Sequence, residues 1–177
     1  LVAKVRSKGA MNCVISSEIL DAEELKKKLE EVPDMDGLEL ASIVSTNVAY
    51  ELGNPDAEIR IAVMDYGVKR HILTCMVDRG AYVKVFPAKT PLEEVKAFGA
   101  NGYFISNGPG DPASMGYAVG TVKELLKDEI PTFGICLGHQ LLALANDIPT
   151  FKMHHGHRGV NHPVKNLVTG KCEITTQ

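Results

Sequence analysis

The sequence has little of several features that would point to whole classes of protein. Its 19 Lys and Arg residues against 22 Asp and Glu residues leave a net charge of −3. That balance gives no electrostatic reason to bind nucleic acid or an anionic membrane surface. Its apolar runs are far shorter than the roughly 20 residues that a membrane-spanning helix needs. We therefore expect neither nucleic acid nor a membrane among its partners.

Closely spaced cysteines are also lacking. The four cysteines are Cys13, Cys75, Cys136 and Cys172, and no two of them form a Cys-x-x-Cys pair. This spacing argues against a disulfide framework and favours reduced thiols in a cytoplasmic protein. Cys13, Cys75 and Cys172 lie in apolar or strand-like runs, which predicts that these three thiols are core residues.

An initiator Met is absent as well. The sequence begins at Leu1, inside a helical pattern, and ends at Gln177, two residues after the strand-like run 173–175. We therefore expect the chain to be a fragment.

From about residue 58 onward, strand patterns alternate with helix patterns. Apolar runs predict strands over 60–64, 82–86, 102–105 and 132–135, and helical spacing predicts helices over 72–77, 91–98 and 119–126. Short connections between such elements favour an α/β fold with a doubly wound, mostly parallel sheet. In these sheets ligands bind outside the carboxyl ends of the strands.

The first 55 residues have a different rhythm. They predict a helix over 1–7, a strand over 12–16, a helix capped by Asp21 and a short helix over 38–44. Ser45–Asp56 shows no periodicity and contains Gly-Asn-Pro, so it predicts a linker. These patterns suggest a division into two domains, 1–55 and 56–177, of which the second is the α/β domain.

Gly134-Ile135-Cys136-Leu137-Gly138 joins the last predicted strand to a helix-forming run. This is the spacing of a nucleophile elbow, with Cys in place of Ser. The sharp turn strains its central residue, and side chains two positions to either side would collide, so Gly is needed there. A helix N-terminus also favours a thiolate. We predict Cys136 as a nucleophile; the alternative is a structural cysteine between two packing glycines.

The string Asn107-Gly108-Pro109-Gly110-Asp111-Pro112 follows the neighbouring predicted strand. An acyl-transfer site needs donors for a tetrahedral oxyanion, and the backbone N–H groups of Leu137 and Gly108 are the expected donors. Glycines let the backbone approach a substrate, while prolines stiffen the loop. The alternative is an ordinary Pro-Gly turn.

The general base is harder to assign. His139 is three residues from Cys136, on the first turn of the predicted helix, so its side chain need not reach the thiol. The other candidates are His154, His155, His157 and His162, which lie among Gly and Pro without Cys or carboxylate companions. That composition does not favour a metal site, and we expect no bound metal.

Four segments together resemble a known family. DYGVKRHI (65–72), SNGPGDP (106–112), FGICLGHQLLALA (133–145) and GHRGVNHPVK (156–165) are similar, in order and spacing, to the small, glutamine-hydrolysing subunits of the carbamoyl-phosphate synthetases. These subunits are class I (triad) glutamine amidotransferases. The resemblance runs from about residue 1 to the end of the chain.

The resemblance implies an activity and its partners. It implies hydrolysis of L-glutamine to glutamate and ammonia through a thioester on Cys136, with Gly108, Gly110, Leu137 and Gln140 contacting the substrate. The ammonia would pass to a large synthetase subunit that uses ATP, Mg and bicarbonate, so this chain would carry no cofactor. The resemblance also makes residues 1–55 the tail of the small subunit's N-terminal domain.

The sequence departs from the family in one respect. The family's triad His and Glu form a His-x-Glu pair, which the resemblance places beyond Gln177, and residues 137–177 contain no such pair. Loss of one triad member leaves a remnant rate of about 10³–10⁴ over water. We therefore expect the isolated chain to be nearly inactive.

Two other interpretations stay open. One is the amidotransferase component of another pathway, of the anthranilate synthase type, although DYGVKRHI, NHPVK and the extra N-terminal residues speak against it. The other is a docking or regulatory module that keeps the fold without a triad.

Overall fold

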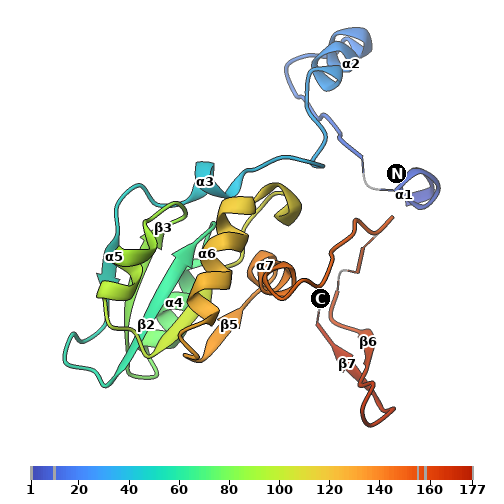
Figure 1. Cartoon of the computed structure of the whole chain (residues 1–177). Coiled ribbons are helices and arrows are strands. Elements are labelled where there is room, and N and C mark those ends of the chain that lie inside the picture. The colour runs from blue at the N-terminus through green and yellow to red at the C-terminus, as the bar shows by residue number, and fades with distance from the viewer. Residues whose placement is uncertain (1, 10, 155, 158, 177) are drawn as a thin grey trace. The chain divides into compact units, whose positions relative to one another are not determined.

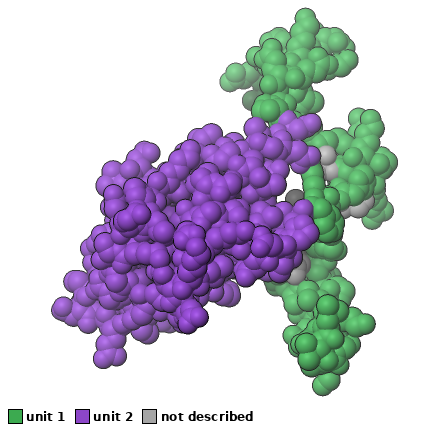
Figure 2. All heavy atoms as spheres, viewed as in Figure 1, with its two compact units in different colours: residues 1–33, 151–177 green, residues 34–150 purple. Residues whose placement is uncertain are grey.

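A computed structural model describes residues 2–9, 11–154, 156–157 and 159–176. The chain divides into two compact units, coloured purple and green in Figure 2. Unit 2 is Asp34–Thr150, and unit 1 combines Leu1–Pro33 with Phe151–Gln177.

Unit 2 is built on a five-stranded sheet in the order β1-β3-β2-β4-β5 (Figure 1). The strands are β1 (Tyr50–Leu52), β2 (Ile59–Asp65), β3 (Ala81–Pro87), β4 (Gly102–Ile105) and β5 (Thr132–Gly134). Strands β2, β3, β4 and β5 are parallel, whereas β1 pairs antiparallel with β3. The structure thus confirms the predicted α/β fold with a mostly parallel sheet.

The order of the strands decides where loops meet. Strand β2 lies between β3 and β4 in the sheet. The connection after β2 leads to β3 on one side of it, and the connection after β3 leads back across to β4 on its other side. Such a switch point opens a crevice at the carboxyl ends of the strands. The segments that follow β2, β4 and β5 therefore start at one edge of the sheet.

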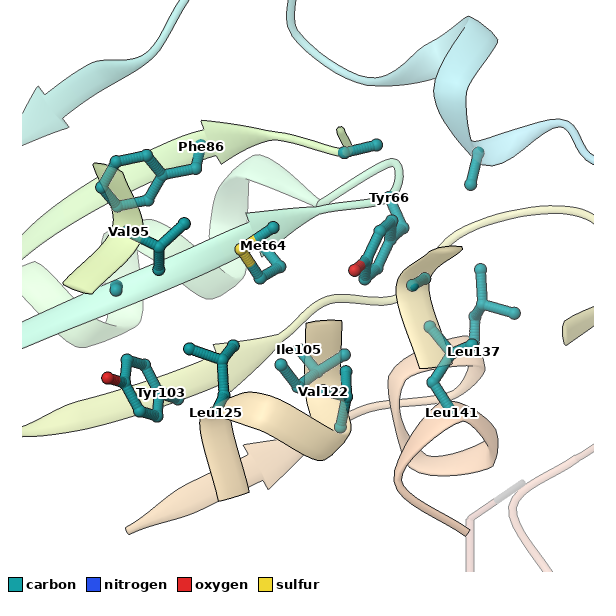
Figure 3. Packing of buried hydrophobic residues seen from close by; sticks show 14 of the residues in the cluster. Met64, Tyr66, Phe86, Val95, Tyr103, Ile105, Val122, Leu125, Leu137 and Leu141 are labelled. Atoms are coloured by element: carbon teal, nitrogen blue, oxygen red, sulfur yellow. The ribbon is translucent and has the colours of Figure 1, made fainter. Parts of the chain in front are cut away.

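Helices cover both faces of this sheet (Figure 1). They are, with one 3₁₀ turn, α3 (Ala41–Val44), α4 (Arg70–Val77), α5 (Leu92–Ala97), η1 (Pro112–Ser114), α6 (Gly116–Leu126) and α7 (Leu137–Ala145). Successive side chains of a strand point to opposite faces of the sheet, so the strands contribute to two separate apolar clusters, one on each face. One packs against α5, α6 and α7 and includes Met64, Ile105, Val122 and Leu141 (Figure 3). The other packs Val63, Val83 and Phe104 against Leu73 of α4.

The predicted linker Ser45–Asp56 is wrong in one respect. It contains β1, whose Tyr50, Glu51 and Leu52 pair with Val85, Lys84 and Val83 of β3. A strand of three residues is too short for its periodicity to be recognised in the sequence. The preceding helix α3 begins at Ala41 rather than at residue 38, and the Ala41 side chain is fully buried in the larger cluster.

Unit 1 contains α1 (Val2–Lys8), α2 (Ala22–Glu30) and an antiparallel pair, β6 (His162–Lys165) and β7 (Cys172–Thr175). Asp21 caps α2, as predicted, by accepting hydrogen bonds from the N–H groups of Glu23 and Glu24. The predicted strand 12–16 is wrong, because these residues form neither strand nor helix.

The predicted burial of three cysteines also fails. Cys13 and Cys172 are exposed, and Cys75 on α4 is only half-buried. Cys172 lies in β7, which pairs with β6 alone in a two-stranded sheet. Side chains of a strand point alternately to its two faces, so an apolar run does not by itself bury each of its members.

Within the described ranges, the helices are all too short or too polar to serve as a membrane span.

Candidate active site

The turn between β5 and α7 places Cys136 in an unusual backbone conformation. Its φ is +54° and its ψ is −112°, a region that costs a non-glycine residue about 1–3 kcal/mol. Cys136 is also the N-cap of α7, and its carbonyl oxygen accepts a hydrogen bond of 3.1 Å from Gln140 N. Its side chain is exposed. The elbow, defined here as residues 134–138, therefore presents a thiol outward on a strained turn.

Both elbow glycines are required by close backbone contacts. A Cβ on Gly134 would lie 2.6 Å from the carbonyl carbon and oxygen of Gly138. A Cβ on Gly138 would lie 2.0 Å from the carbonyl oxygen of Ile105 at the end of β4. These distances confirm the predicted reason for glycine on either side of Cys136. The close approach of Gly138 to Ile105 also packs the elbow against the end of β4.

The second part of the site is the glycine loop, defined as residues 107–112. A Cβ on Gly108 would lie 1.9 Å from the carbonyl oxygen of Tyr66 and 3.0 Å from Cδ2 of Leu137. The loop after β4 therefore lies directly against the first residue of α7. The structure thus brings together Gly108 and Leu137, the two residues predicted to donate to an oxyanion.

The N–H groups of these two residues are available. Within the described ranges, neither Gly108 N nor Leu137 N donates a hydrogen bond to another protein group. Leu137 is the first residue of α7, where the backbone N–H has no partner inside the helix. Its side chain is buried, so packing holds this donor in place.

Below the glycine loop the site is apolar. Tyr66 lies next to Met64 and Leu137 in the core (Figure 3) and is fully buried. Its hydroxyl has no hydrogen-bond partner among the described groups. Burial, with the neighbouring Tyr117, raises the pKa of Tyr66 well above its ordinary value of 10.0. The floor of the site is therefore neutral.

Three polar residues to which the sequence assigned no individual role hold the loops at this edge of the sheet. Ser106 and Asn107 connect the loops after β2 and β4, and Asp65 connects the loop after β2 to Thr46. The Ser106 hydroxyl, fully buried, accepts a hydrogen bond from Tyr66 N (2.8 Å) and donates to the Asn107 carbonyl. The Asn107 side chain donates to the Gly67 carbonyl and accepts from Lys69 N. The Asp65 carboxylate accepts from the backbone N–H groups of Gly67, Val68 and Thr46. Polar residues after parallel strands were the only sequence signal for this network.

An open hollow of about 610 Å³ lies beside the glycine loop, and its lining comprises Val44, Thr46, Tyr50, Asp65, Gly67, Val68 and Pro109. Cys136 is not part of this lining. The candidate site is therefore assigned to the elbow and the adjoining glycine loop, which carry Cys136 and the two predicted donors, rather than to the hollow.

The remaining candidate residues have fewer contacts with Cys136. Gln140 and His139 are exposed on the first turns of α7, and no hydrogen bond between described groups joins His139 to Cys136. The rings of His157 and His162 contact each other in unit 1, with centroids 5.3 Å apart. His155 lies outside the described residues. No general base is assigned by geometry.

No cluster of three or more His, Cys, Asp or Glu side chains in the described part of the chain could hold a metal ion. The backbone donors at Gly108 and Leu137 instead suit a developing negative charge on a carbonyl oxygen. The arrangement as a whole suits attack by a thiolate on an acyl carbon.

Comparison with known proteins gives a consistent family. Residues 62–177 match the class-I glutamine amidotransferase family. Similar curated proteins include the carbamoyl phosphate synthase small chain of Chlorobaculum tepidum, 46% identical over 100% of this chain and 49% of the relative. The protein of the same name from Pseudomonas putida is 44% identical over 98% of this chain and 50% of the relative. The chain spans about half the length of these curated relatives.

Proposed function

Because the chain belongs to the class-I glutamine amidotransferase family, we propose that it carries the glutamine-hydrolysing site of a carbamoyl-phosphate synthase small subunit. The observation that carries the proposal is the strained Cys136 next to two free backbone donors, on Leu137 and Gly108. The family name, glutamine amidotransferase, supports glutamine as the substrate, and the relatives' name, carbamoyl phosphate synthase small chain, supports a role in carbamoyl phosphate synthesis.

In the proposed reaction the Cys136 thiolate attacks the side-chain amide carbon of glutamine. A C–S bond forms, and the carbonyl oxygen becomes an oxyanion that accepts hydrogen bonds from Leu137 N and Gly108 N. The C–N bond then breaks, and the nitrogen takes up a proton and leaves as ammonia. Water attacks the thioester, the C–S bond breaks, and glutamate and the free thiol are restored. One glutamine and one water thus give one glutamate and one ammonia.

Substrate contacts are proposed for Gly108, Gly110, Leu137 and Gln140. Gly108 and Leu137 support this because they adjoin each other beside Cys136. Gln140 lies one turn further along α7, and its backbone N–H is bonded to Cys136 O.

The proposed partner is a large synthetase subunit that receives the ammonia and uses ATP, Mg and bicarbonate. The words "small chain" in the relatives' names support a larger partner. The four dispersed cysteines support work in the cytoplasm. We assign the general base to residues outside 1–177 and expect slow glutamine turnover by the chain alone.

The two-domain division at residue 55 is retained as a proposal. The family match begins at residue 62, which supports a boundary near this point. Compactness divides the chain elsewhere, because unit 2 already begins at Asp34. Residues 34–55 therefore belong to unit 2 by compactness, although the proposed domain boundary and the family match place them before the amidotransferase domain.

The proposal is tested by labelling the chain with a chloroketone analogue of glutamine, followed by intact-mass measurement and peptide mapping. We expect one adduct, on Cys136, that excess glutamine prevents. Iodoacetamide, which lacks the amino-acid part, should also label the exposed Cys13 and Cys172, and excess glutamine should not protect these two thiols. Cys172→Ser is the matched control, because Cys172 is also exposed and its loss should leave the labelling unchanged.

Glutamine-insensitive labelling of Cys13, Cys75, Cys136 and Cys172 alike would contradict the proposal. That outcome would favour a docking or regulatory module with the same fold.

A further inference from the structure

The glycine loop is attached to a segment far upstream in the sequence. This segment, called the brace here, is residues 37–46, and it precedes the range 62–177 that matches the family. Gly37 N donates to Asp111 Oδ2 (3.1 Å), and Asp111 N donates to the Leu38 carbonyl (3.0 Å). The pair spans 74 positions in the chain. One residue of the glycine loop thus holds the brace with both its side chain and its backbone.

The two carboxylate oxygens of Asp111 have separate partners. Oδ1 accepts a hydrogen bond from Ala113 N (2.9 Å) and caps the 3₁₀ turn η1, whereas Oδ2 accepts the bond from Gly37. Capping alone would need only one oxygen. The second oxygen therefore serves the attachment to the brace.

Gly110 brings the two backbones into contact. Its φ is +101°, and a Cβ at this position would lie 2.8 Å from the Leu38 carbonyl oxygen and 3.1 Å from Leu40 N. The loop therefore cannot move further toward the brace, while the Asp111 bonds oppose movement away from it. Gly108 is three residues upstream of Asp111, whose bonds fix the loop to the brace.

The brace is itself fastened to the core of unit 2. Ala41 is fully buried. The Glu39 carboxylate accepts hydrogen bonds from Ser42 and from the Tyr117 hydroxyl on α6. Thr46 N donates to Asp65 Oδ2 (2.8 Å), and Ser45 Oγ accepts from Ala88 N (2.9 Å). The brace can therefore act as a fixed support for the loop.

We propose that Asp111 is a positioning residue that sets the place of the Gly108 oxyanion donor by fastening the glycine loop to the brace. The inference rests on the proposed function, since it concerns the same oxyanion. It also places a determinant of catalysis in residues 37–40, upstream of the matched family range. Errors of about 1 Å in the position of a catalytic group can lower a rate by up to about 100-fold.

Asp111→Asn separates attachment from capping. The Asn side chain keeps one oxygen for Ala113 N, but it presents an NH₂ group to Gly37 N–H, which cannot accept a hydrogen bond. Asp21→Asn is the matched control, because Asp21 caps α2 through Glu23 N and Glu24 N in the same manner and belongs to unit 1, whereas the loop and the brace belong to unit 2.

The first measurement is the rate at which the chloroketone analogue labels Cys136, as a function of its concentration. Asp111→Asn should lower the maximal rate constant about tenfold, while the concentration for half-maximal rate changes less than about threefold. A merely structural role would lower the fraction of chains labelled and not the rate constant. Iodoacetamide, which needs no oxyanion donor, should label Cys136 at the wild-type rate. Asp21→Asn should match wild type in all of these.

The second measurement is amide hydrogen exchange, which does not depend on the chemistry. Asp111→Asn should speed exchange in peptides covering 37–40 and 107–112, and leave β2 and β4 unchanged. Unchanged exchange at 37–40, or faster exchange there with a wild-type labelling rate, would overturn the positioning role. Wild-type chain without glutamine-protected labelling, but with the exchange effect, would instead overturn the proposed function and with it the role in catalysis.

Discussion

The elbow and the glycine loop form the two halves of the proposed oxyanion site, but different contacts hold them. The elbow is held by steric contact between residues four positions apart, Gly134 and Gly138, and by the Ile105 carbonyl. The glycine loop is held by hydrogen bonds that reach from Asn107 to residues about 40 positions away and from Asp111 to Gly37, 74 positions away.

This difference separates two ways of building a site. A steric contact between backbones has no alternative arrangement nearby, so the elbow tolerates only glycine at its two ends. Hydrogen bonds can be removed one at a time, each at a cost of about 1 kcal/mol. We therefore expect substitutions in the elbow to disrupt folding, and substitutions in the loop to change its position.

The largest effect is expected at the elbow. Gly138→Ala would put a Cβ 2.0 Å from the Ile105 carbonyl oxygen, and the nearest atoms all belong to the backbone of Ile105 and Ser106, which cannot rotate away as a side chain could. We expect a loss of about 4 kcal/mol in the free energy of unfolding of unit 2, measured by urea denaturation. Gly120→Ala is the control, because Gly120 lies inside α6 with open space around it, and it should gain about 0.5–1 kcal/mol. Equal stabilities of the two variants would show that the elbow is not sterically held.

A smaller effect is expected where the loop meets the brace. Gly110→Ala and Gly80→Ala both place a side chain at positive φ, +101° and +85°, but only the first meets backbone, at 2.8 Å from Leu38 O. Gly80→Ala should cost about 1 kcal/mol through strain alone. Gly110→Ala should cost about 3 kcal/mol, since the brace must also shift. Equal losses in urea denaturation would mean that loop and brace separate freely.

The smallest effect is a pH dependence confined to the brace. Partial burial raises the pKa of Glu39, but hydrogen bonds from Ser42 and Tyr117 and the charge of Lys89 outweigh it and hold the pKa below 4.5. A lowered pKa stabilises the folded state above the ordinary value, and this contribution is lost as the pH falls through the lowered pKa.

Comparison of wild type with Glu39→Gln isolates this contribution. The difference in free energy of unfolding should be largest above pH 4.5 and shrink as the pH falls below it, because Gln cannot ionise. Circular dichroism during urea titration at several pH values measures it. A difference that does not change with pH would show that the charge of Glu39 contributes nothing to holding the brace.

The sequence predicted most elements of unit 2 because long apolar runs and helical spacing are strong local signals. Strand β4 has the predicted bounds, and β2, β3 and β5 differ from theirs by one or two residues. It did not predict β1, whose three residues gain strand geometry only by pairing with β3. It also predicted a strand over 12–16 that is not formed, which shows that a short apolar run without a partner strand need not adopt that geometry.

The candidate site likewise has one part that local sequence signals predicted and one part that depends on distant partners. The spacing of glycines around Cys136 could be read directly, because the contacts that require glycine lie within five consecutive residues and the next strand. Individual roles for Ser106, Asn107 and Asp111 were not recognised, because polar residues in a loop have many possible roles in turns. Their actual roles depend on partners at Tyr66, Lys69 and Gly37.

By itself, then, the sequence determined the α/β order and the elbow around Cys136, the predicted nucleophile, since each follows from residues that are neighbours in the chain. The tertiary structure decided that Gly108 lies against Leu137 and that residues 37–46 support the glycine loop. The physical reason is that a hydrogen bond between Gly37 and Asp111 exists only after the sheet has brought the two segments together. Before folding, nothing in either segment specifies the other.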